Sequence, residues 1–71
     1  MMTEIINTQP DGDMTLTIRV TYEEWNAAYA PHGVYVTHNG YQWTGLTLRS
    51  EEAVVALRDT LNEYIWERGI E

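Results

Sequence analysis

The segment from Met14 to Val20 alternates apolar and polar side chains at every position. Its apolar residues share one face, and its threonines and Arg19 share the other. A period of two residues is typical of a strand with one face on a core and one in water. A chain with such a strand needs further strands or a helix to cover the apolar face.

Near the C-terminus the apolar residues are spaced as in a helix. Ser50 is a good N-cap and Gly69 a good C′ residue, so we expect a helix from Glu51 to about Arg68. Apolar residues three and four positions apart predict its core side. They are Val54, Leu57, Leu61 and Ile65, with Ala53 and Tyr64 flanking them.

Two local signals lie between these elements. Thr21-Tyr22-Glu23-Glu24 matches a capping box and predicts a short helix over about Tyr22–Ala30. Asn39-Gly40 is a strong hairpin signal, so Val34–His38 is expected to pair with Tyr41–Leu48.

In that hairpin Val36 faces Trp43 on the core side. Strict alternation would turn Leu46 and Leu48 outward, so we expect a bulge near Thr44-Gly45 that returns both to the core.

The order of elements predicts one α+β domain over residues 1–71. Pro10-Asp11-Gly12-Asp13 is a turn signal, which makes residues 1–13 either a loose tail or a short edge strand at Ile5-Ile6. The expected fold is an antiparallel sheet of three to four strands, with a short helix after the first long strand and the C-terminal helix packed on one face.

Eleven acidic residues against four basic ones give a net charge of −7. This charge argues against direct binding to nucleic acid or to anionic lipid, and it favours a basic partner or plain solubility. The chain has no cysteine and only two histidines, so we expect no cofactor or metal. No apolar run approaches a membrane span and no signal peptide begins the chain, so we expect a cytoplasmic protein.

No residue pattern predicts catalysis. The only serine, Ser50, is explained as a helix cap, and His38 has no neighbour in the sequence to orient it. Asp11-Gly12-Asp13 has two carboxylates but lacks the later ligands of a calcium loop. We therefore expect no enzyme and no catalytic residue.

Carboxylates line one side of the predicted C-terminal helix. They belong to Glu52, Asp59, Glu63 and Glu67, and all lie within about 60° of Glu52. Arg58 and Arg68 are expected nearer the core edge. The line is either a solvated helix face or an imitation of a phosphate row. It is sparse, with four carboxylates over about 22 Å where duplex DNA carries about 13 phosphates; a dimer would make it denser.

The stretch from Pro31 to Leu48 contains no charged residue. It is either a central hairpin with covered edges or a surface that pairs with a second copy or a partner. Tyr35 in this stretch and Trp66 on the C-terminal helix are candidate anchors, because tyrosine and tryptophan are enriched at interface hot spots. Trp66 has the alternative of covering the rim of the sheet.

The run Trp43-Thr-Gly-Leu-Thr-Leu48 followed by Glu51-Glu52-Ala53 resembles a strand-to-helix segment of small phage and actinobacterial proteins. In size and acidity the whole chain resembles phage-encoded anti-defence inhibitors of the anti-CRISPR and anti-restriction type. This resemblance implies an inhibitor that acts by binding in the cytoplasm of a host cell.

We therefore expect a small acidic, non-enzymatic inhibitor that occludes a basic nucleic-acid-binding surface of a host protein or complex. The expected partner-binding residues are Glu52, Asp59, Glu63, Glu67, Trp66 and Tyr35. The alternative is a self-associating, homodimeric structural or regulatory module of a phage or bacterium without nucleic-acid mimicry.

Overall fold

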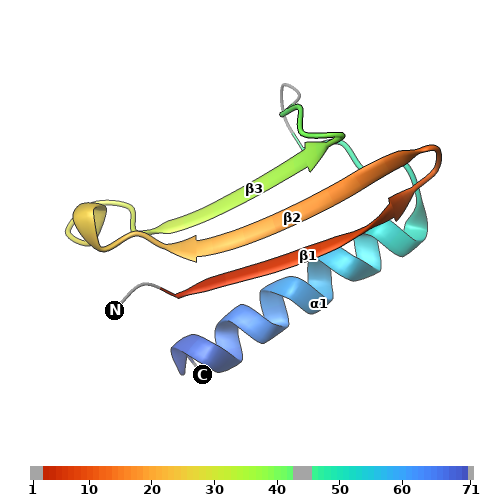
Figure 1. The fold of residues 1–71 in the computed structure, drawn as a ribbon. Helices are drawn as coiled ribbons and strands as arrows, with labels where there is room; N and C mark the ends of the chain where they lie inside the picture. The colour runs from red at the N-terminus through yellow and green to blue at the C-terminus, as the bar shows by residue number, and fades with distance from the viewer. Residues whose placement is uncertain (1–2, 43–45, 71) are drawn as a thin grey trace.

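The structure, a computed structural model, describes residues 3–42 and 46–70. Three antiparallel strands form one sheet in the order β1-β2-β3, and a long helix lies along one side of it (Figure 1). The elements are β1 (Glu4–Asp11), β2 (Met14–Tyr22), β3 (His32–His38) and α1 (Glu51–Arg68). The expected α+β fold is confirmed.

Residues 4–11, before the first turn, form an edge strand and not a loose tail. β1 pairs with β2 over its whole length, from Glu4 opposite Thr21 to Asp11 opposite Met14. Gly12 has a φ of 69° in the turn, a conformation that a residue without Cβ adopts at no steric cost. The strand is longer than the expected Ile5-Ile6 segment because the ladder continues to the turn.

The predicted helix over Tyr22–Ala30 is wrong in extent. A single 3-10 turn, η1 (Glu24–Asn26), is present instead. Thr21 is not an N-cap but continues β2, where it lies opposite Gly33 of β3. Pairing with β3 therefore prevails over the local capping signal.

The Asn39-Gly40 turn is confirmed. Both residues have positive φ, 51° and 85°, and His38 and Tyr41 exchange two backbone hydrogen bonds of 2.9 Å. Tyr41 pairs with His38 in an isolated bridge, and the described residues 42 and 46–48 continue no strand.

The rest of that predicted hairpin has a mixed outcome. Trp43 and the bulge predicted at Thr44-Gly45 lie outside the described residues. Leu48 packs against the core as expected, whereas Leu46 is 62% exposed, so its predicted burial is wrong.

The core lies between α1 and the apolar face of β2. Leu16, Ile18 and Val20 are fully buried, as their alternation predicts. The backbone of α1 lies against β1 and β2 and not against β3.

The predicted core side of α1 is confirmed in part. Ala53 and Tyr64 are buried, and Leu57 and Leu61 pack against the core as expected. Val54, expected in the core, is 55% exposed. The buried residues are Ala53, Ala56, Thr60 and Tyr64. Small side chains allow the helix backbone to approach the sheet closely, and the Tyr64 hydroxyl donates to the Thr21 carbonyl at 3.2 Å. Close approach and this hydrogen bond outweigh the greater hydrophobicity of the predicted stripe.

Both predicted ends of α1 are confirmed. The Ser50 hydroxyl accepts a hydrogen bond of 3.2 Å from the Ala53 amide, and Gly69 has the left-handed φ of 65°.

We predict that Leu16→Ala lowers the free energy of unfolding by about 2–5 kcal/mol, because it empties a fully buried site under α1. Urea denaturation followed by circular dichroism measures the change. The control is Val55→Ala on the outside of the helix, which should stay within about 0.5 kcal/mol of the parent. Equal losses for the two variants would contradict the placement of the core.

Candidate functional site

One flank of α1, beside its buried residues, carries exposed carboxylates. Glu52, Asp59, Glu63 and Glu67 are all exposed. Their spacing keeps them on one side of the helix although the buried side differs in part from the predicted one. We name Glu52, Asp59, Glu63, Trp66 and Glu67 the outer face of α1.

The outer face keeps most of its negative charge. Among the described residues, Glu52, Glu63 and Glu67 have no ion-pair partner. Asp59 accepts hydrogen bonds of 3.0 and 3.1 Å from Arg58, which corrects the expectation that Arg58 lies apart from the acidic line.

The remaining arginines are engaged elsewhere on the chain. Arg19 binds Glu4, Arg49 binds Asp13, and the Arg68 guanidinium lies 3.7 Å from the centre of the Tyr22 ring. These three contacts lie off the outer face, so they leave Glu52, Glu63 and Glu67 uncompensated.

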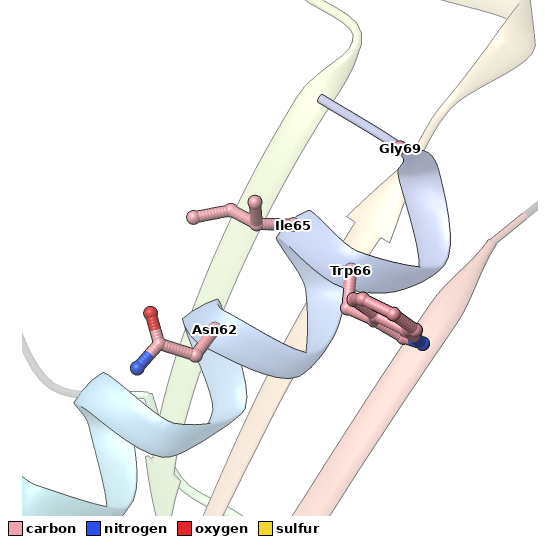
Figure 2. Close-up of a pocket in the computed structure, with 4 residues that line it drawn as sticks. All are labelled: Asn62, Ile65, Trp66 and Gly69. Carbon is pink, nitrogen blue, oxygen red and sulfur yellow. The ribbon is translucent and has the colours of Figure 1, made fainter. Parts of the chain in front are cut away.

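Trp66 is the aromatic residue of this face. Its side chain is 82% exposed, so the alternative in which it covers the sheet rim is wrong. With Asn62, Ile65 and Gly69 it lines an open hollow of about 430 Å³ on the last turns of α1. Figure 2 shows Trp66 and Ile65 pointing to different sides of the helix.

Tyr35 is not brought together with the outer face. It lies opposite Arg19 on the side of the sheet away from α1, and the Arg19 guanidinium is 4.5 Å from its ring centre. Its hydroxyl donates to Glu23 at 2.8 Å, and this hydrogen bond raises the pKa of Tyr35 above its ordinary value. Tyr35 and the helix carboxylates therefore cannot contact one flat partner surface together.

A buried polar cluster lies where the β1–β2 turn, the end of β3 and the start of α1 meet. The Asp11 carboxylate is 1% exposed and accepts three hydrogen bonds. The donors are Nε2 of His38 at 2.8 Å, the backbone amide of Arg49 at 3.0 Å and the hydroxyl of Ser50 at 2.8 Å. The bond from His38 is the main cause that lowers the pKa of Asp11, against the opposing effect of burial.

Sequence reasoning missed this cluster. His38 has no neighbour in the sequence that orients it, but Asp11 does so from 27 positions away. No local spacing signals such a contact. The only hint in the sequence is an acidic residue at a turn, Asp11, together with a histidine in a later strand, His38. Many surface turns contain such an acid, so the hint is not specific.

The cluster has the residue types of a catalytic triad but not its connectivity. A nucleophilic serine hydroxyl has to donate to the histidine, whereas here Ser50 donates to Asp11 and accepts from Ala53. The geometry is that of a helix cap reinforced by a buried carboxylate.

The described residues contain no group of three or more side chains suited to hold a metal ion. None of their helices is long and apolar enough to cross a membrane. Comparisons with protein families, curated proteins and solved structures find no match to the chain.

We predict that Asp11→Asn destabilises the protein more at about pH 6 than at about pH 3, because a carboxylate with a lowered pKa contributes stability only while it is ionised. That contribution is fully present above the unfolded pKa, near 3.8, and is lost as the pH falls through the lowered folded value. Thermal unfolding at both pH values measures it.

Asp13→Asn in the same turn is the matched control. The pKa of Asp13 is also lowered, by its hydrogen bond from Arg49, but its side chain is 85% exposed and screened by water. The difference in stability between pH 6 and pH 3 should therefore change less in Asp13→Asn than in Asp11→Asn. A pH-independent difference between the parent and Asp11→Asn would contradict the role of the Asp11 charge.

Proposed function

We propose that this chain is a non-enzymatic binding protein that places the outer face of α1 on a basic, nucleic-acid-binding surface of a host protein and so blocks that surface. It acts as a phage-type inhibitor in the cytoplasm of the host cell. The single observation that carries the proposal is an exposed tryptophan beside carboxylates that have no cation of their own.

The charge of the outer face supports a basic partner. Burial of an unpaired carboxylate costs free energy. A partner that covers Glu52, Glu63 and Glu67 must therefore supply cations to offset the loss of their hydration. A surface that binds nucleic acid is rich in lysine and arginine. Complementary charge also speeds the encounter, so the association is expected to weaken with added salt.

Trp66 supports a specific contact over a diffuse one. A side chain that is 82% exposed in the free protein has most of its apolar area available for a partner. Tryptophan is among the residues that most often dominate binding free energy. Arginine on the partner would also gain a cation–π contact with the indole.

The proposal is tested by capture from host lysate with the tagged protein, at low and at high salt, with mass spectrometry of the retained proteins. A nucleic-acid-binding protein retained at low salt and released at high salt is expected. A DNA duplex added in excess should displace it. Retained proteins without any affinity for nucleic acid would contradict the proposal.

We predict that Glu63→Lys with Glu67→Lys weakens the captured complex at least tenfold, or about 1.4 kcal/mol. Lysine near the C-terminal end of a helix is favourable for the helix dipole, so folding should be intact. The control pair is Asp13→Lys with Glu24→Lys, which makes the same change of net charge from −7 to −3, since −7 + 4 = −3. Equal losses in the two pairs would show an effect of net charge alone.

We also predict that Trp66→Ala weakens the complex by about 30-fold, or about 2 kcal/mol, and leaves its salt dependence unchanged. Titration calorimetry with the captured protein measures both quantities. An unchanged affinity would remove Trp66 from the binding surface.

A further inference from the structure

Among the described residues, β3 is an edge strand of the sheet. On this edge His38 exchanges its two backbone hydrogen bonds with Tyr41, whereas the next residue, Asn39, donates its amide to Thr15 of β2. Backbone groups alternate in direction along a strand, so those of Val34 and Val36 point to the same edge as those of His38. Among the described residues, no strand pairs with them there.

Two of the devices that usually protect an edge strand, charge and proline, are missing from β3. Edges are blunted by charged side chains, proline or covering structure. β1 carries Glu4 and Pro10, but β3 has neither charge nor proline. Val34 in the middle of β3 is 40% exposed. The edge of β3 is therefore suited to pair with another strand.

We propose that β3 pairs antiparallel with β3 of a second copy of this chain, with Val34 opposite Val34 at a two-fold axis. In this register His32 lies opposite Val36 of the second copy, so all outward backbone groups of residues 32 to 36 are used. The inference goes beyond the proposed function and does not rest on it, because the outer face of α1 stays free in the pair.

The charge of the chain favours a second copy at this edge. Two copies with a net charge of −7 repel each other over most of their surfaces. The stretch from Pro31 to Leu48 has no charged residue and belongs to the longest uncharged stretch in the chain, residues 25–48. A basic partner would have no carboxylate to bind at this strand. A second copy of the uncharged strand can form backbone hydrogen bonds with it, and a two-fold axis limits the assembly to a dimer.

The geometry of the pair is consistent with the rest of the fold. A two-fold axis that relates antiparallel neighbours is perpendicular to the sheet, so both helices lie on the same side of a six-stranded sheet. Since α1 lies over β1 and β2, the helix axes would be about 19 Å apart for a strand spacing of about 4.8 Å. The helices then do not collide, and the contact is confined to the two β3 strands.

The side of the helix turned toward β3 carries aliphatic side chains beside Arg58. Figure 2 shows Ile65 on this side, with β3 behind it, and Val54 lies on the same side by helical spacing. Val54 is 55% exposed in the single chain. In the pair these side chains border a trough whose floor is the paired β3 strands.

The test uses the absence of cysteine from the sequence. Val34→Cys places one thiol at the two-fold axis, where the Cα separation of antiparallel neighbours of about 5.5 Å allows a disulfide. Mild oxidation should link this variant at least about tenfold faster than Val55→Cys, because paired strands hold the thiols at a high effective concentration. Val55, 44% exposed on α1, matches Val34 in size and exposure.

Sedimentation equilibrium of the unmodified chain is expected to show a dimer. Val34→Lys should reduce it to a monomer, and Val55→Lys should not. A monomeric parent overturns the proposal. So does a dimer that survives Val34→Lys. If the parent is monomeric and the Val34 and Val36 amides are still protected from hydrogen exchange, the edge is covered by the chain's own residues and the proposal is wrong.

Discussion

The Asp11 carboxylate is the interaction on which the arrangement of the elements depends. It lies at the end of β1 and binds side-chain or backbone donors from the end of β3 and from the start of α1. A buried carboxylate is costly unless its oxygens are satisfied, and three hydrogen bonds satisfy this one. The network fixes where α1 begins relative to the sheet, and hence which side of the helix faces water.

The second determinant is the use of small residues on the helix. Ala53, Ala56 and Thr60 face the sheet, and Tyr64 anchors the far end through the Thr21 carbonyl. Leu57 and Leu61 pack at the side of this contact, and Val54 lies on the flank toward β3, where it stays exposed. This rotation explains both surfaces: the carboxylates and Trp66 remain exposed, and a flank with Val54, Arg58 and Ile65 faces the side of β3.

Much of the fold could be predicted because its signals are local. The alternation in β2, the Asn39-Gly40 turn and the caps at Ser50 and Gly69 each depend on a few adjacent residues. The short helix was mispredicted because a capping box at Thr21 competes with a ladder to β3, and only the ladder depends on distant residues. The prediction of which residues of α1 face the sheet failed at Val54. Hydrophobicity ranks valine above alanine, whereas close packing of the helix on the sheet requires alanine.

For the candidate site, exposure of the carboxylates followed from helical spacing alone, and so did their common side. The position of Tyr35 on the opposite side of the sheet required knowing which side α1 covers. The Asp11–His38 contact joins residues 27 positions apart, and no periodicity encodes it. Contacts between polar residues on different elements are therefore the part of this structure that sequence patterns do not reach.

The contacts between the two ends of the described chain have a consequence for biosynthesis. Arg68 donates to Thr3, and Asn7 donates to Thr60, across 65 and 53 positions. While the sheet emerges from the ribosome, Leu16, Ile18 and Val20 have no helix to cover them. The nascent chain therefore exposes its apolar face until residues 51–68 are outside the exit tunnel, and it depends on rapid helix docking to escape aggregation.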